Sequence, residues 1–544
     1  MTRTRLVALA IIGTVVAGTT AFLLAGRGTS DPVVPRFVDE STTSGIEHVY
    51  DGEFPFFVGG GVATFDCNDD GKPELYFAGG VNDAALYVND SSIGGALRFS
   101  RKESPVTDLA AVTGAYPLDV DGDDVLDLVV LRRGSKHVLR GLGDCGFEDV
   151  TDRLGIDAGD DWTVAFSATW EEGSSLPTLA FGNYLIPDTY DCATNELWRP
   201  SAAGYSTPIE LPAHCTLSVL FSDWNDDGHS DLRVSNDRNY DRYAEEQLWR
   251  IRPGEEPREY GESDGWRKVV IWGMGIASYD LTGDGRPEVY LTSQADNKLQ
   301  SLEDGASGPS YRDIALERGV TAQRPYAGGD ILPSTAWHPE FDDVNNDGFV
   351  DLFVSKGNVD AQVDYAKHDP NNLLLGRSDG SFVERGEQAG INNDARSGGA
   401  VLADLNLDGL LDVVVVNRRV SVEIRRNVGT GTADSPTPLG HWLALTLSQP
   451  TANTHAIGAK IDVRFGDRTT RREVTIGGGH ASGDASWIHF GLGTARTAEV
   501  RVTFPGEAPG AWMTVDSDGF YDITRGADLP TSGLPATDAE RKVG

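Results

Sequence analysis

The feature that most constrains this chain is a ten-residue acidic segment that occurs six times with one spacing. Each copy has the form D-x-[DNT]-x-D-[GD]-x-x-[DE]-[LV]. The copies are DCNDDGKPEL at 66, DVDGDDVLDL at 119, DWNDDGHSDL at 223, DLTGDGRPEV at 280, DVNNDGFVDL at 343 and DLNLDGLLDV at 404. One such segment is typical of an ordinary turn. Six in a single register indicate a structural repeat.

Positions 1, 3, 5 and 9 of each copy place side-chain oxygens on one side of a tight turn. With a backbone carbonyl at position 7 they form the oxygen cage that calcium prefers. Position 6 is Gly, which permits a positive φ, except for Asp124 in the second copy. The segments are not EF-hands, because position 12 carries no Glu and the flanks resemble strands. We therefore expect about six calcium ions, one per copy. The predicted ligands are Asp66, Asn68, Asp70, Glu74, Asp119, Asp121, Asp123, Asp127, Asp223, Asn225, Asp227, Asp231, Asp280, Thr282, Asp284, Glu288, Asp343, Asn345, Asp347, Asp351, Asp404, Asn406, Asp408 and Asp412.

The spacing of the copies reveals one further repeat. Their starts are 53, 104, 57, 63 and 61 residues apart, so the second interval is about twice the others. Within it, FSATWEEGSSLPTLAFGNY from Phe166 follows the outline of GVATFDCNDDGKPELYFAGG, with Glu171 in place of the first Asp. Seven repeats of short strands predict an all-β fold, a seven-bladed β-propeller.

A second pattern marks the outer strand of each blade. FEDVTDRLGI at 147, YRDIALERGV at 311 and FVERGEQAGI at 382 share an aromatic residue, an acid, a Gly and an aliphatic residue at fixed positions. FVDESTTSGI at 37 has the same form but precedes the first blade, whereas the last blade ends after SVEIRRN at 421. We therefore expect the N-terminal segment to supply the outer strand of the seventh blade and to close the ring.

Charge and the N-terminal residues indicate where the protein works. The formal net charge of -37 argues against nucleic acid or an anionic membrane surface as partner. Residues 1–30 combine Arg3 and Arg5 with an apolar stretch from Leu6 to Ala25, which is typical of export. This segment is either a removable signal peptide or a membrane anchor, the only expected contact with a membrane. Both alternatives predict an extracytoplasmic protein, secreted or anchored.

These loops and strands resemble FG-GAP/VCBS repeats, as found in integrin α heads and in the cartilage acidic protein family. From His441 the segments HWLALTL, HAIGAKIDVRF, IHFGLG and EVRVTFPG resemble the ASPIC/UnbV module that follows such propellers. The stretch HASGDAS matches that module poorly. We predict a propeller over 31–435, an ASPIC/UnbV-like β-domain over 436–526 and a disordered tail over 527–544.

Four cysteines in an exported chain permit three disulfide pairings. Cys67 and Cys145 fall in loops at the acidic end of the blades, whereas Cys192 and Cys215 fall at the other end. Since a disulfide spans at most about 7 Å between Cα atoms, the propeller predicts pairing of Cys67 with Cys145 and of Cys192 with Cys215. The alternative is four free buried thiols.

The longer loops lie at the end of the blades away from the acidic segments. Aromatic residues on long loops over a rigid scaffold suit an extracellular protein or glycan partner, although local packing is the alternative. The aromatic residues concerned are Tyr190, Tyr240, Tyr243, Trp272, Tyr326 and Trp337. We predict a non-catalytic binding or adhesion protein, with a lectin as the alternative.

An enzyme is the rival class. The candidate cluster is His338 with Asp330 and Glu340. The sequence contains no G-x-S-x-G, H-E-x-x-H or phosphate-binding Gly loop, so a hydrolase or lyase acting on extracellular polymers is the less favoured hypothesis.

Overall fold

The structure is a computed structural model that describes residues 31–156, 159–186, 189–201, 204–321, 332–359, 362–527, 529–532 and 534. The apolar N-terminal stretch lies outside these residues. Among the residues described, no helix combines the length and the apolar character that crossing a membrane requires.

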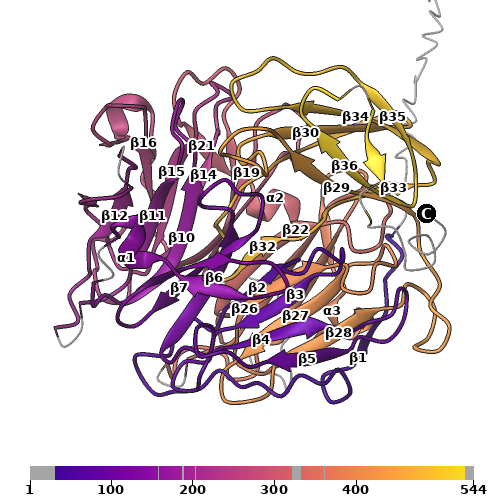
Figure 1. Ribbon diagram of the computed structural model, residues 1–544, viewed down its shortest axis with the longest axis horizontal. Coiled ribbons are helices and arrows are strands. Elements are labelled where there is room, and N and C mark those ends of the chain that lie inside the picture. The colour runs from indigo at the N-terminus through magenta and orange to yellow at the C-terminus, as the bar shows by residue number, and fades with distance from the viewer. Residues whose placement is uncertain are drawn as a thin grey trace, which may run out of the picture.

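Seven four-stranded antiparallel sheets form the blades of a propeller (Figure 1). Six blades have their strands in chain order from the axis outward, whereas the outer strand of the seventh is the N-terminal strand β1. The first three blades contain β2 (Val62–Phe65), β3 (Glu74–Phe77), β4 (Ala85–Asn89) and β5 (Phe99–Lys102); β6 (Val112–Leu118), β7 (Asp127–Arg132), β8 (His137–Gly141) and β9 (Phe147–Asp149); and β10 (Thr163–Thr169), β11 (Thr178–Asn183), β12 (Asn195–Trp198) and β13 (Ile209–Leu211). The degenerate repeat at Phe166 is therefore a complete blade, as predicted.

The remaining blades continue this order around the ring. They contain β14 (Thr216–Ser222), β15 (Asp231–Asn236), β16 (Gln247–Arg250) and β17 (Arg258–Glu259); β18 (Gly273–Tyr279), β19 (Glu288–Ser293), β20 (Lys298–Leu302) and β21 (Tyr311–Asp313); β22 (Ala336–Asp342), β23 (Asp351–Lys356), β24 (Asn372–Gly376) and β25 (Phe382–Glu384); and β26 (Ser397–Ala403), β27 (Asp412–Asn417) and β28 (Glu423–Asn427) with β1 (Phe37–Asp39). Phe37 pairs with Asn427, so the N-terminal segment closes the seventh blade as predicted.

Short helices follow three of the outer strands. They are α1 (Thr151–Leu154), α2 (Ala315–Arg318) and α3 (Gly386–Ala389), and a 3₁₀ turn, η1 (Glu262–Asp264), follows β17. The shared Gly of the outer-strand pattern ends each α-helix in the left-handed region, at Gly155, Gly319 and Gly390. The pattern that predicted outer strands thus also specifies the turn that leads to the next blade.

The C-terminal domain packs two four-stranded sheets face to face around a shared apolar core. Its strands lie to one side of the blades, at the upper right of the view (Figure 1). The strands are β29 (His441–Ser448), β30 (Lys460–Phe465), β31 (Arg468–Glu473), β33 (Ile488–Gly493), β34 (Thr497–Thr503), β35 (Met513–Asp516), β36 (Gly519–Thr524) and β37 (Thr531–Ser532). Thr531 pairs with Asp522, so ordered structure continues past residue 526, where we expected a disordered tail to begin.

Residues 474–486, here called the plug segment, leave the C-terminal domain and run into the centre of the propeller. Their short strand β32 (Gly483–Ala485) pairs in parallel with the inner strand β2 of the first blade. Further bridges join Ser482 to β6, Ile476 to β10, Gly477 to β14 and Gly479 to β18. The plug segment therefore occupies the axis where the inner strands converge.

Glycines of the inner strands make room for this segment. A Cβ at Gly61 or Gly114 would lie 1.8 or 2.3 Å from the carbonyl oxygen of Ala481, and one at Gly399 would lie 2.2 Å from Ser482 Oγ. In the sixth blade His338 takes the corresponding position, and its Nδ1 accepts a hydrogen bond of 3.0 Å from the backbone N–H of His480. The plug segment thus fills the space that side chains at these glycine positions would occupy.

Candidate metal centres and partner face

All six acidic segments form the same turn between the first and second strands of their blades. The first Asp accepts hydrogen bonds from the backbone N–H groups at positions 5 and 6, as Asp404 does from Asp408 at 3.0 Å and Gly409 at 2.7 Å. Position 6 has a positive φ in every copy, including 69° at Asp124. The predicted local conformation is therefore correct, and it fixes the first carboxylate inside the turn.

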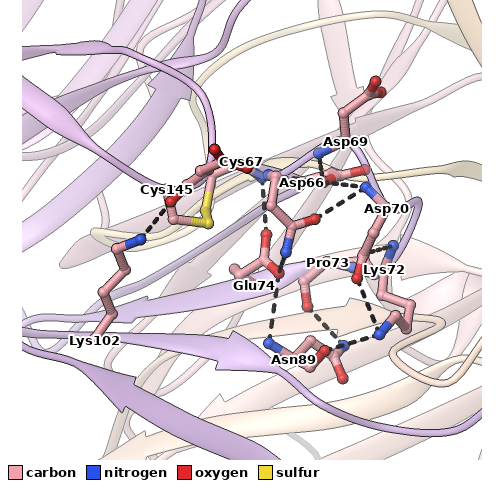
Figure 2. The surroundings of a disulfide bond; sticks show 12 residues. Asp66, Cys67, Asp69, Asp70, Lys72, Pro73, Glu74, Asn89, Lys102 and Cys145 are labelled. Atoms are coloured by element: carbon pink, nitrogen blue, oxygen red, sulfur yellow. Dashed lines mark hydrogen bonds and ion pairs between the residues drawn. A yellow bond between two sulfur atoms is a disulfide. The ribbon is translucent and has the colours of Figure 1, made fainter.

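The ninth residue is buried beneath each turn. In the first loop Glu74 accepts hydrogen bonds from Cys67 N at 2.8 Å and from Asn68 Nδ2 at 3.0 Å. Figure 2 shows its carboxylate between Cys67 and Asn89, with Asp66 and Asp70 nearby. Each of the six loops brings its four predicted oxygen-bearing residues into one turn, and in the second loop the carboxylate oxygens of Asp119, Asp121 and Asp127 lie within 4.8 Å of one another.

The crowding of carboxylates changes their ionisation. Burial, with the like charges of Asp66 and Asp70 added to it, raises the pKa of Glu74 to about 8. In the seventh loop, burial and the neighbouring Asp408 carboxylate raise the pKa of Asp404 to about 8. These are sites at which a bound cation would stabilise the ionised form.

The donor atoms of the seventh loop show whether a metal ion fits there. In the seventh loop Asn406 is fully buried and its Oδ1 has no hydrogen-bond partner among the described residues, as expected of an oxygen reserved for a cation. Asp404, Asp408 and Asp412 supply the other oxygens, and the nearby Arg426 is paired instead with Glu40 at 2.9 Å. This donor set fits a hard divalent cation.

Protein cations approach some of the loops. Arg140 contacts Asp121 at 2.6 Å and also pairs with Asp123 in the second loop. In the degenerate third blade Arg199 lies 2.6 Å from Glu171, which also accepts a hydrogen bond from Thr178. The third blade thus keeps an acid at the first position of its loop, and Arg199 neutralises it.

The C-terminal domain covers the end of the blades that carries the acidic loops. Trp487 Nε1 donates to Gly71 O at 2.8 Å, and His489 Nε2 lies 2.6 Å from Asn346 Oδ1. Contacts to the other loops come from Thr454 to Asp119, Lys460 to Asp223, Arg471 to Gly285 O and Trp442 to Gly409. All six acidic loops therefore also serve as supports for the second domain.

The two disulfides lie at opposite ends of the blades. Cys67 is bonded to Cys145 and Cys192 to Cys215, with Cα atoms 4.7 and 4.6 Å apart, as the propeller topology predicted. The first links the acidic loop of blade one to the outer turn of blade two. The second fixes the loop that presents Tyr190.

The end opposite the acidic loops carries a group of stacked aromatic rings. Tyr190 stacks on Phe54 with ring centres 5.3 Å apart and on Tyr240 at 6.4 Å. Tyr190 is 56% exposed, Tyr240 43% and Tyr243 68%. Tyr190 also has a positive φ of 63°, a conformation that a bulky residue rarely adopts. Phe54, which sequence analysis missed, belongs to this surface.

The remaining predicted residues of this face divide into three cases. Trp337 is only 3% exposed and its ring packs 4.9 Å from His480, so it is a packing residue and not part of the surface. Trp272 is half-buried beside Arg238 at 5.7 Å. Tyr326 lies outside the described residues, as does Asp330 of the alternative catalytic cluster.

The plug segment was also missed, although the sequence carried a signal for it. Gly61, Gly114, Gly275 and Gly399 each stand five residues before the first Asp of an acidic loop. A glycine repeated at this strand position indicates close approach of another backbone segment. The segment that approaches contains HASGDAS, the stretch that matched the expected module poorly.

Residues 66–130 and 343–415 match the FG-GAP-like repeat family, and residues 449–529 match the ASPIC and UnbV family. The protein is a propeller with FG-GAP-like repeats followed by an ASPIC and UnbV domain.

Curated relatives agree with this class. The chain is 31% identical to mouse and to human cartilage acidic protein 1 over 159 residues, and 28% identical to the Xenopus tropicalis protein. The matched part is 27% of this chain and only 21% of each relative, so it spans about a fifth of their length.

Two solved structures are similar to the chain at low sequence identity. One is BBS1N in complex with ARL6DN, with a TM-score of 0.41, 10% identity and coverage of 74% of this chain and 100% of the other. Another is the SapL1 lectin in complex with alpha methyl fucoside, with a TM-score of 0.34, 12% identity and coverage of 60% and 95%.

Proposed function

We propose that this protein is an exported, calcium-stabilised and non-catalytic binding protein, whose extracellular protein or glycan partner docks on the propeller face opposite the acidic loops. One observation carries the proposal. The C-terminal domain covers the acidic end of the blades, whereas exposed aromatic side chains gather at the other end. The covered end supports the fold, and the uncovered end is available for recognition.

Calcium is the metal that best suits the acidic loops. Their donors are carboxylate and amide oxygens and the Thr282 hydroxyl, without His, and the two described cysteine pairs are disulfides. Oxygen donors favour hard cations, and flexible turns with several carboxylates favour calcium over the smaller magnesium. The chemistry that the ion supplies is neutralisation of converging charges, and Asn406 with Asp404, Asp408 and Asp412 would hold it in the seventh blade.

The proposed binding surface consists of Phe54, Tyr190, Tyr240 and Tyr243. The Cys192–Cys215 disulfide fixes one of its loops, so little conformational entropy would be lost when a partner binds. Large half-exposed aromatic side chains on a rigid support are common at the centres of protein interfaces and in contact with sugar rings.

His338, the histidine of the alternative catalytic cluster, makes contacts of a structural kind. His338 is 5% exposed and its Nδ1 accepts the backbone N–H of the plug segment, and its Nε2 lies 3.4 Å from Glu340. Burial lowers the pKa of His338 to about 4. These contacts support a structural role for the pair and favour the non-catalytic interpretation.

Two disulfides and the apolar N-terminal stretch support export into an oxidising compartment. The test of function is a glycan array and an affinity capture from extracellular fluid, each performed with the calcium-loaded chain and with Tyr190→Ala. We expect a protein or glycan that wild type retains and the variant loses. A hit that Tyr190→Ala and Tyr240→Ala retain fully would contradict the assignment of this face. Discrete carbohydrate hits would identify the lectin alternative.

A further inference from the structure

In the fourth blade, buried cations pair with the carboxylates of the acidic loop, whereas Arg140, the cation that pairs with the second loop, is more exposed. Lys460 Nζ lies 2.8 Å from Asp223 Oδ2 and also contacts Asp226. Arg252 Nη2 lies 2.6 Å from Asp227 Oδ2, and its Nη1 is paired with Asp231. Both cationic residues are buried, each 8% exposed. Four carboxylates in this one loop are therefore matched by two protein cations.

Asp231, the ninth residue of the loop, has no free acceptor position. Its Oδ1 accepts hydrogen bonds from Ile251 N at 3.0 Å and from Arg252. Its Oδ2 accepts from Trp224 Nε1 and from the Tyr260 hydroxyl, both at 2.8 Å. A carboxylate offers about four lone-pair sites, so these four donors saturate it. No lone pair of this residue remains for a metal ion.

The seventh loop shows the contrasting arrangement. Asp412, at the same ninth position, accepts one backbone N–H on each oxygen, from Asn427 at 2.8 Å and from Leu405 at 3.2 Å. Half of its lone pairs are thus still available. The unpartnered Asn406 Oδ1 adds another available oxygen. The two loops share a sequence pattern but present different donor sets.

The lysine at the fourth loop comes from the C-terminal domain. Lys460 begins β30 and pairs in the sheet with Glu473, the last residue of β31. Glu473 accepts hydrogen bonds from Asp223 N at 2.9 Å and from Ser222 Oγ at 2.7 Å. One strand pair therefore contacts the loop through a cation and an anion at once. We propose that the fourth acidic loop holds no metal ion, because Lys460 and Arg252 replace it, and that this loop serves as an ionic dock for the C-terminal domain.

This inference refines the proposed function, from which it takes the calcium occupancy of the other loops. The test compares two matched substitutions of the first Asp, Asp223→Asn and Asp404→Asn, in the full chain. Bound calcium per chain is measured by elemental analysis after equilibrium dialysis. We expect wild type to bind one ion for each of the other five loops. Asp404→Asn should bind one ion fewer and Asp223→Asn the same number as wild type. A loss of one ion in Asp223→Asn would overturn the proposal.

A second variant, Lys460→Met, leaves every acidic residue in place. We expect its melting temperature to fall by the same amount in calcium and in chelator, because it loses a charge pair that does not depend on metal. An unchanged or raised melting temperature would overturn the docking role. A wild-type chain that binds no calcium would contradict the proposed function instead, and Lys460→Met would then decide the present inference alone.

Discussion

The two ends of the propeller differ in what holds their loops in place. At the acidic end, short turns of one conformation carry converging carboxylates and are covered by a second domain. At the opposite end, long loops of unequal length are held by a disulfide and by stacked aromatic rings that remain exposed. The repeated acidic turns therefore support the fold, whereas the loops of unequal length at the opposite end can vary to recognise a partner.

The largest effect on stability is expected when the acidic end of the blades is uncovered. A chain that ends at residue 435 loses the second domain and the plug segment, so the inner strands lose their axial partner. We expect a propeller that aggregates or melts at least about 10 °C lower, since this removes buried apolar contacts worth several kcal/mol. The melting temperature is measured by calorimetry. The control ends at residue 534 and should melt like the full chain. Equal melting of the 435 truncation would show that the two domains fold independently.

Removal of calcium should have the next largest effect. Extracellular sites with a Kd of roughly 10⁻⁴ to 10⁻³ M contribute on the order of 0.4 to 1.4 kcal/mol each at millimolar calcium. Several such sites predict a fall in melting temperature of roughly 5 to 15 °C in chelator. Binding to the captured partner should change little at calcium levels that leave the fold intact. A change in binding without a change in melting would instead indicate a calcium sensor.

A smaller effect is expected from pH at the plug segment. Burial raises the pKa of Glu340 from 4.5 to about 8 and that of Asp484 from 3.8 to about 7. A carboxyl whose folded pKa is raised stabilises the fold while neutral, so stability is lost as pH rises from about 4 to about 8. Glu340→Gln should weaken this loss, measured as melting temperature against pH in saturating calcium. Glu317→Gln on the exposed helix α2 is the control. Parallel curves for Glu340→Gln and wild type would contradict the prediction.

The smallest effect on stability belongs to the aromatic face. Tyr190→Ala and Tyr240→Ala each remove a half-exposed ring, so we expect melting shifts of only about 1 to 3 °C, together with a loss of partner retention. Leu316→Ala, at a position that is 84% exposed on α2, is the control and should alter neither. A large fall in melting temperature for Tyr190→Ala would mean that the stacked rings support the fold, and the comparison between the two ends would lose its basis.

Sequence reasoning recovered the features that repeat. The register of the acidic loops predicted seven blades, the outer-strand pattern predicted closure through Phe37, and the propeller topology predicted both disulfides. Each of these features depends on local spacing or on the symmetry of the ring. The hidden third blade was found since its strands kept their apolar pattern after the loop lost its acids.

What the sequence did not reveal depends on contacts between distant segments. Lys460 lies 237 residues from Asp223, and nothing in its surroundings marks it as a partner of that loop. The plug segment was missed as well: the repeated inner-strand glycines indicate that a backbone segment approaches, but they do not identify which segment it is. Trp337 was assigned to the surface because a tryptophan near a loop can point outward, whereas here it packs against His480.

The plug segment also limits when the chain can complete its fold during synthesis. Gly59 N bonds His480 Nε2 across 421 residues of sequence, and the first blade pairs with β32 over a similar separation. Contacts of such long range form slowly, because loop closure costs entropy before any contact is gained. An emerging chain therefore leaves the inner strands without their axial partner until residues 474–486 have been synthesised. During that interval the incomplete ring exposes apolar strand surface of the kind that chaperones bind.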